Sequence, residues 1–233
     1  MTSRLEHLRY IARKVFRPRT TRIDGFRVEV RPEFPRQMRK GLYKGTYEQA
    51  ERILVHDMLD PSDRVLEIGT GVGIVALSCA KICGADSVLC YEANPKLAEV
   101  IRANMAMNGF DVTLRNRAVA VESGTATFHV GDAVVSSGLR DNGNVAERIT
   151  VPCDAMADVV QEFRPTAVVM DCEGAEIDLL PAADLGGVRK ILLEIHPRSI
   201  GREATDGLVR HLEDAGFRCI AREDKGDVLG FVR

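Results

Sequence analysis

The chain has 233 residues, of which 28% are charged and 45% hydrophobic, and its net charge is −2. This length and composition are typical of one large globular domain, alone or with a modest extension. No apolar run reaches the roughly 18 residues that a membrane span requires. Residues 1–16 are rich in arginine and lack the continuous apolar stretch of a secretory signal. We therefore expect a cytoplasmic protein without a membrane span.

The six cysteines are scattered through apolar segments, and no two of them form a C-x-x-C pair. A disulfide framework or a metal cluster would require closer spacing or a shorter chain. The pattern instead favours small buried side chains in a reducing compartment, in agreement with a cytoplasmic location.

Charge is distributed unevenly along the chain. Residues 1–44 contain 13 Lys or Arg and 4 Asp or Glu, whereas residues 45–233 contain 19 and 30. We interpret residues 1–44 as a basic N-terminal extension and residues 45–233 as the main domain. Such an extension can steer an anionic substrate, a nucleic acid or a membrane surface toward the domain, or dock on a second subunit to form a homo-oligomer. Because no interleaved aromatic residues or RNA-binding motif accompany the charge, nucleic-acid recognition is disfavoured.

Helical and strand patterns alternate from residue 46 onward. Thr46 and Gln49 have the spacing of a capping box, and residues 53–59 carry a helical apolar face that ends before Pro61. A short buried strand at 64–68 follows and leads into a glycine-rich loop. Strands alternating with helices indicate a mostly parallel sheet that is covered on both faces.

The same alternation continues to the C-terminus. Helices are expected at 74–82, 94–108, 155–163, 175–180 and 203–215, and strands at 87–92, 112–120, 167–170, 190–195, 217–221 and 228–232. The last two strands are joined by six residues, too few for a parallel connection, so they must be antiparallel. The sequence therefore predicts a Rossmann-like α/β fold of the class I methyltransferase type, a seven-stranded mostly parallel sheet with a C-terminal antiparallel hairpin. The Gly/Asn/Ser-rich stretch at 131–148 is expected to be a loop near the site.

The glycine-rich loop carries the strongest chemical motif. Gly69, Gly71 and Gly73 let the backbone turn tightly and approach a ligand closely. Glu67 lies beside this loop, where its carboxylate can accept a hydrogen bond from an ammonium group. Glu92 ends the next strand and can accept hydrogen bonds from both ribose hydroxyls of an adenosine, a role that NAD enzymes share. The G-x-G-x-G spacing favours a methyltransferase over an NAD-dependent oxidoreductase; a glycine-rich turn without a ligand is the structural alternative.

Polar side chains also follow the fourth and fifth strands. Asp171, Glu173 and Glu176 come after the fourth strand, at the crevice where open α/β sheets bind ligands, so we expect Asp171 to touch cofactor or substrate. Glu176 also has a simpler interpretation, as an acid stabilised by a helix N-terminus. His196 follows the fifth strand on the same rim and can accept a hydroxyl proton, although a purely structural histidine is equally compatible with the sequence.

Several of these segments together resemble the FkbM-type methyltransferases over residues 44–198. The segments that carry the resemblance are 44–48, 67–73, 91–95, 136–137, 171–176 and 194–197. The D-x-E-G-A-E stretch at 171–176 is the most specific of them. The first loop departs from the G-A-N-x-G form of many family members and has the form that is common in the wider methyltransferase superfamily.

The resemblance implies transfer of a methyl group from S-adenosyl-L-methionine to a hydroxyl of a small molecule, such as a sugar or a natural product. The cofactor-binding residues that it implies are Glu67, Gly69, Gly71, Gly73, Glu92, Ala93, Asn94, Ala118 and Asp171. Tyr47 and Glu48 are expected to fold over the cofactor.

An alcohol must lose its proton to become a good nucleophile, so a base is expected near the site. His196 is the first candidate and Glu173 the second; a divalent cation such as Mg²⁺, held by Asp171 and nearby carboxylates, is an alternative. Three other functions stay open at this point. They are an N-methyltransferase acting on nucleic acid, although the N-P-P-aromatic turn typical of such enzymes is missing, an NAD-dependent oxidoreductase, and a non-catalytic cofactor-binding module.

Overall fold

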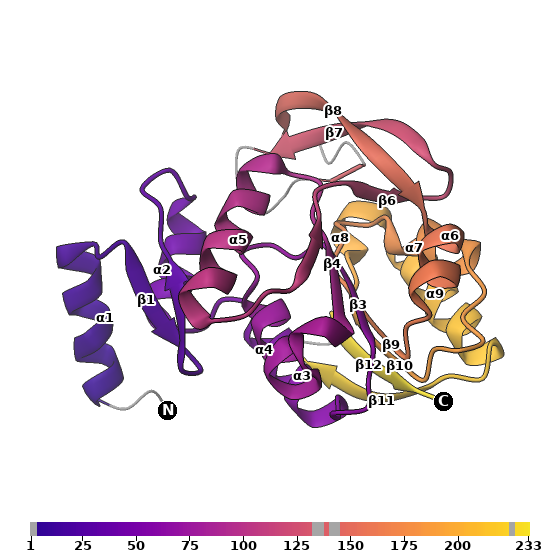
Figure 1. Cartoon of the computed structure of the whole chain (residues 1–233), viewed down its shortest axis with the longest axis horizontal. Coiled ribbons are helices and arrows are strands. Elements are labelled where there is room, and N and C mark those ends of the chain that lie inside the picture. Colours follow the sequence, from indigo (N-terminus) through magenta and orange to yellow (C-terminus); the bar gives the residue numbers. More distant parts are fainter. Residues whose placement is uncertain (1–3, 132–137, 140–144, 224–226) are drawn as a thin grey trace.

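The computed structural model describes residues 4–131, 138–139, 145–223 and 227–233. Its centre is a seven-stranded sheet in the order β11-β12-β10-β9-β3-β4-β5 (Figure 1). The strands of this sheet are β3 (Val65–Ile68), β4 (Val88–Tyr91), β5 (Thr113–Arg115), β9 (Ala167–Met170), β10 (Lys190–Glu194), β11 (Arg218–Glu223) and β12 (Val228–Val232). Neighbouring strands run parallel from β5 to β10, and β12 is antiparallel to both β10 and β11. The predicted fold class and closing hairpin are confirmed.

Helices cover both faces of this sheet. One face packs on α3 (Gln49–Met58), α4 (Ile74–Cys83) and α5 (Pro95–Asn108), and the other on α6 (Met156–Phe163), α7 (Glu176–Leu179) and α9 (Arg202–Asp214). Alternate residues of a strand point to opposite faces, so Val65 belongs to the first core and Leu66 to the second. The buried strands therefore read as continuous apolar runs, as expected of a parallel sheet.

A small second sheet stands beside the carboxyl edge of the central one (Figure 1). It has the order β6-β8-β7, formed by β6 (Ala118–Ala120), β7 (Gly124–Gly131) and β8 (Val145–Ala155). The prediction of a single strand at 112–120 is wrong. The first strand, β5, ends at Arg115, and the next, β6, pairs with β8 in the second sheet. Most of the loop expected at 131–148, including Ser136 and Ser137, lies outside the described residues.

The predicted capping box at the start of α3 is also wrong. Glu48 occupies the N-cap position in a left-handed conformation, with φ of 48°, and makes no side-chain cap hydrogen bond. In contrast, the predicted cap of α5 is confirmed, because Asn94 accepts a hydrogen bond from the backbone N–H of Lys96 at 3.0 Å.

Residues 4–44 form α1 (Arg4–Phe16), a hairpin of β1 (Thr20–Ile23) and β2 (Phe26–Glu29), and α2 (Arg36–Lys44). The hairpin joins the main core. Asn104 and Asn108 of α5 accept hydrogen bonds from the backbone of β2, each at 2.8 Å, and Phe26 packs edge-on against Phe110. Helix α1 is the outermost element of this segment (Figure 1). The functional boundary predicted at residue 44 stays a prediction.

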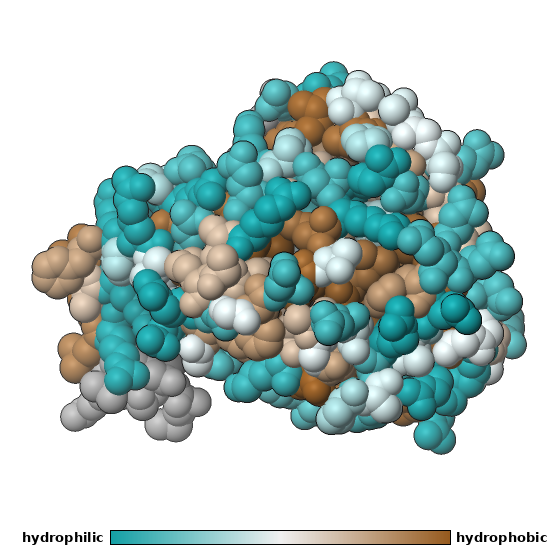
Figure 2. All heavy atoms as spheres, viewed as in Figure 1, coloured by the Kyte–Doolittle hydropathy of each residue, from teal (hydrophilic) through white to brown (hydrophobic). Residues whose placement is uncertain are grey.

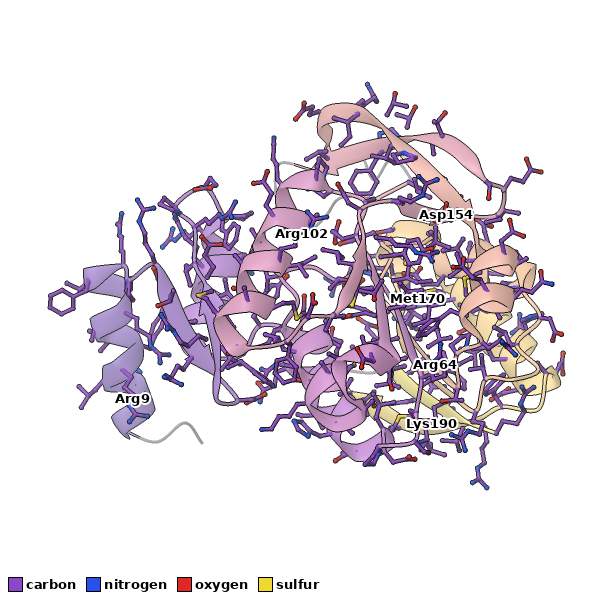
Figure 3. All side chains as sticks on the ribbon, viewed as in Figure 1. Arg9, Arg64, Arg102, Asp154, Met170 and Lys190 are labelled. Carbon is purple, nitrogen blue, oxygen red and sulfur yellow. The ribbon has the colours of Figure 1, made fainter. Side chains whose placement is uncertain are left out.

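The amino end of the central sheet is fixed by a buried carboxylate. The Asp63 side chain is fully buried and accepts hydrogen bonds from Thr166 Oγ1 at 2.9 Å and Arg189 Nη2 at 3.1 Å. Lys190 Nζ lies 2.6 Å from both Asp60 and Asp63. Lys190 begins β10 and pairs with the first residue of β9, so this network lies at the end of the sheet opposite Met170 (Figure 3). No helix of the described residues is long and apolar enough to cross a membrane.

Candidate functional site

The carboxyl ends of β3, β4 and β9 meet at one cavity. Backbone atoms of the glycine loop, carboxylates and apolar side chains line it together. The lining residues include Tyr47, Glu48, Gly69, Gly71, Glu92, Ala93, Leu97, Arg117, Ala118, Val119, Phe128, Asp171 and Glu173. A cavity with a polar rim at strand ends and an apolar wall suits a ligand that has one charged end and one flat apolar end.

The glycines of the loop differ in what surrounds them. A Cβ added at Gly69 would lie 1.7 Å from the carbonyl oxygen of Asp171, so these two strand ends touch directly. A Cβ at Gly71 would lie 2.6 Å from Glu48 Oε1, within the cavity. Gly73 faces Ile101 and Met105 of α5 and therefore serves helix packing. Of these three glycines, Gly69 and Gly71 line the cavity and Gly73 does not.

A turn at residues 45–48 covers the glycine loop. Tyr47 and Glu48 belong to it and line the cavity; that they fold over a cofactor stays a prediction. The turn is held by Arg52, a buried side chain that donates hydrogen bonds to the carbonyl oxygens of Tyr47 at 3.1 Å and Gly45 at 2.9 Å and that also bonds Asp24 of the N-terminal hairpin. Sequence reasoning missed Arg52, although an arginine three residues before buried Val55, on the core side of a helix, was a usable signal.

Glu92 lies at the end of β4, directly against the glycine loop. Its carboxylate accepts hydrogen bonds from the backbone N–H of Gly71 at 3.2 Å and of Asn94 at 2.7 Å. Burial raises the pKa of Glu92 to about 7, although those backbone donors act in the opposite direction. The backbone N–H of Ala93 also donates to this carboxylate, so one of its four lone pairs remains for a ligand.

Glu67 lies on the other side of Gly69, in a smaller adjoining cavity that also includes Glu48, Glu51 and Asp171. Cys90 Sγ is 3.1 Å from its carboxylate. The side chain is almost fully buried, and this burial raises its pKa to about 8. Six of the residues predicted to bind cofactor line the first cavity, namely Gly69, Gly71, Glu92, Ala93, Ala118 and Asp171, whereas Glu67, Gly73 and Asn94 do not.

A second, strongly acidic cavity adjoins the first. Tyr47, Glu48, Asp171 and Glu173 line both cavities and so form the wall between them. The second cavity adds Glu51, Glu194, His196 and Glu223. Six carboxylates and one histidine therefore surround this space, which makes it unsuitable for a phosphate and suitable for a neutral or cationic group.

His196 lies at the centre of these carboxylates. Its Nε2 is 3.4 Å from Asp171 Oδ1 and 3.6 Å from Glu173 Oε2, and its Nδ1 is 3.4 Å from Glu176 Oε1. Burial lowers the pKa of His196, but the acidic partners Glu176, Asp171 and Glu173 outweigh this effect and raise it to about 9. The imidazole is therefore protonated near neutral pH.

Three carboxylates of the site, Asp171, Glu173 and Glu194, have raised pKa values. Burial raises the pKa of Asp171 to about 7, although His196 opposes this rise. Burial likewise raises the pKa of Glu173, which sits in a left-handed conformation with φ of 54°. A residue other than glycine in that conformation is uncommon, and such local strain is typical of functional sites. The pKa of Glu194 is raised to about 11 by burial and by Asp171.

Donor atoms of Asp171, Glu176 and His196 all lie within 4.8 Å of one another, a spacing that one cation could span. A histidine must be neutral to bind a metal, so a cation would have to compete with the proton that His196 holds. Leu97 and Phe128 are apolar residues of the first cavity that the sequence did not reveal. Phe128 lies on β7, and its place depends on a sheet that was not predicted in this arrangement.

Comparison with known proteins gave matches to methyltransferases. A family model described as the methyltransferase FkbM domain matches residues 67–219. A ribosomal protein L11 methyltransferase of Symbiobacterium thermophilum is 29% identical over 122 residues, which cover 50% of this chain and 40% of that protein. Its counterpart of Geobacter sulfurreducens is 29% identical over 93 residues, covering 40% and 31%. The chain thus spans less than half the length of these curated relatives. The crystal structure of a Pyrococcus furiosus methyltransferase has the same fold, with 14% identity, 98% coverage of both chains and a TM-score of 0.52.

Proposed function

Because this chain belongs to the FkbM methyltransferase domain family, we propose that it transfers a methyl group from S-adenosylmethionine to a hydroxyl of a small molecule. The family match covers residues 67–219, and S-adenosylmethionine is the cofactor expected of this family. The observation that carries the proposal is the pair of adjoining cavities, one with glycine backbone and Glu92, the other with His196 and carboxylates. The first suits the cofactor and the second the acceptor.

The residues of the first cavity, the one at the glycine loop, fit this cofactor. Glu92 retains a free lone pair for a ribose hydroxyl, and the glycine loop leaves room for the methionine end. Leu97, Val119 and Phe128 supply an apolar surface for the adenine. When bound, the cofactor supplies an electrophilic methyl group on a positively charged sulfur.

The protein must orient the acceptor hydroxyl and take its proton. Since His196 already holds a proton near neutral pH, we assign the base to Glu173, whose carboxylate lines both cavities. His196 would then be its neighbouring cation, which favours the ionised form of Glu173 and Asp171. In this arrangement no metal ion is required.

A second candidate is methylation of an amino group on a protein. The curated relatives are named ribosomal protein methyltransferases, and an acidic cavity suits a cationic side chain. The same acidity disfavours the nucleic-acid alternative at the reacting end, because phosphates would be repelled.

The test begins with calorimetric titration of the protein with S-adenosylhomocysteine and, separately, NADH. We expect binding of the first only, and about 10- to 100-fold weaker binding in Glu92→Gln, which loses a charged acceptor. Glu122→Gln, an exposed acid, is the matched control. Binding without turnover on hydroxylated sugars, amino sugars or lysine-containing peptides would instead support a non-catalytic module. Turnover on the peptides alone would support the second candidate.

A further inference from the structure

Four apolar side chains of helix α1 are exposed to solvent. Leu8, Ile11, Val15 and Phe16 are 62%, 43%, 68% and 82% exposed. Leu8, Ile11 and Val15 follow one another at spacings of three and four residues, so they lie on one face of the helix. We call these four residues the outer apolar face; Figure 2 shows hydrophobic residues at this outermost edge, where α1 lies in Figure 1.

The opposite side of α1 is the one that contacts the protein. Arg13 donates a hydrogen bond to the carbonyl oxygen of Tyr43 at 2.9 Å, and Lys44 Nζ lies 5.2 Å above the ring of Tyr10. A surface helix normally buries its apolar face against the core. Here Tyr10 packs partly on the core and polar and cationic contacts add to it, while the outer apolar face is left without a partner among the described residues.

A basic groove runs beside this helix. It is lined by α1, α2 and the neighbouring loops and contains no acidic residue. Its cations are Lys14, Arg17, Arg19, Arg31, Arg36, Arg39 and Lys40. Five of them, all but Arg31 and Arg39, are exposed and have no side-chain hydrogen bond or ion pair within the described part of the chain.

We propose that α1 and the basic groove together bind the surface of an anionic lipid membrane, with the outer apolar face inserted among the acyl chains and the groove cations on the headgroups. Amphipathic helices with apolar and Lys/Arg-rich faces bind membranes in this way. A bilayer is the partner that offers both an apolar layer and a dense array of anions. This proposal is independent of the reaction that the enzyme catalyses.

The two other classes of partner fit less well. A nucleic acid supplies phosphates but would leave the outer apolar face in water. Pairing of α1 with α1 of a second copy would bring the unpaired cations of both copies together. The rest of the described surface exposes only three other large apolar side chains, Ile53, Val121 and Ile220, so it offers little to cover the outer apolar face.

The experiment is sedimentation of the whole protein with vesicles of phosphatidylcholine, alone or mixed with phosphatidylglycerol. We expect binding to the mixed vesicles only, weakened by salt, and reduced about tenfold or more in Ile11→Ser/Val15→Ser/Phe16→Ser. Val121→Ser/Ile220→Ser is the apolar control. Lys14→Gln/Arg36→Gln/Lys40→Gln should weaken binding similarly, whereas Arg102→Gln/Arg210→Gln, on α5 and α9, should not.

Circular dichroism and thermal unfolding establish that each variant is folded. No binding to either vesicle, or equal binding of the apolar variant and its control, overturns the proposal. Binding of polyuridylic acid that is lost in the groove variant, without vesicle binding, would assign the surface to nucleic acid. A dimer in light scattering that the apolar variant converts to a monomer would assign it to a second copy.

Discussion

The two ends of the central sheet both bury carboxylates, but they do so in opposite ways. At the amino end, Asp63 has a partner for each oxygen, from Thr166, Arg189 and Lys190. At the carboxyl end, Asp171 Oδ1 and Glu176 Oε2 are buried without a hydrogen-bond partner among the described residues. A fully paired buried charge holds a fold together, whereas an incompletely paired one costs stability and is kept where a ligand or a proton completes it.

The largest effect is expected when the paired end is broken. Asp63→Ala removes the acceptor of Lys190 and leaves a partly buried ammonium with only Asp60, so we expect a loss of about 3–5 kcal/mol in the free energy of unfolding. Urea denaturation measures this loss, with Asp86→Ala, an exposed acid, as the control. An equally small loss of unfolding free energy in both variants would show that Asp63 contributes no more to stability than an exposed acid does.

A smaller, pH-dependent effect is expected at the other end. Glu67 has a folded pKa of about 8, raised above that of the unfolded chain, so the folded protein holds a proton that the unfolded one releases. The cofactor-free protein should therefore lose stability as pH rises from about 4.5 to about 8, by as much as about 1.4 kcal/mol for each pH unit.

Glu67→Gln should flatten this slope, as followed by thermal unfolding in a series of buffers, while Glu122→Gln should leave it unchanged. Glu92 and Asp171 have raised pKa values too and should keep part of the slope. A wild-type protein that became more stable over this range would contradict the burial of these carboxyls in a protonated form.

The smallest effect is a shift in the pH profile of turnover. His196 lowers the pKa values of Asp171 and Glu173, so His196→Asn should move the acid limb of the kcat profile to higher pH, by about one unit, and keep activity above it. Glu173→Gln should lower kcat about 100-fold or more at every pH. His211→Asn on α9 is the control. Loss of turnover at every pH in His196→Asn would make the histidine the base.

The sequence predicted the parts of this molecule that depend on local pattern. The buried strand at 167–170, the cap at Asn94 and the closing hairpin need only periodicity and turn chemistry, and all three are confirmed. The strand pairing of the second sheet and the anchoring of the 45–48 turn by Arg52 were not predicted, because they rest on contacts distant in sequence, such as β6 with β8 and Arg52 with Asp24. The acids at the strand ends were visible, but their protonation depends on burial, which appears only in three dimensions.

The 45–48 turn joins two surfaces that have been described separately. Helix α2 lines the basic groove and ends at Lys44, and four residues later Glu48 lies against Gly71 in the first cavity. A ligand in the basic groove and a ligand in the first cavity would therefore contact one continuous segment, residues 36–48. If the partner of the groove changes the affinity for cofactor by some factor, the cofactor changes the affinity for that partner by the same factor. If that factor differs from one, the cofactor-bound and cofactor-free protein would distribute differently between a membrane surface and solution, without a separate regulatory domain.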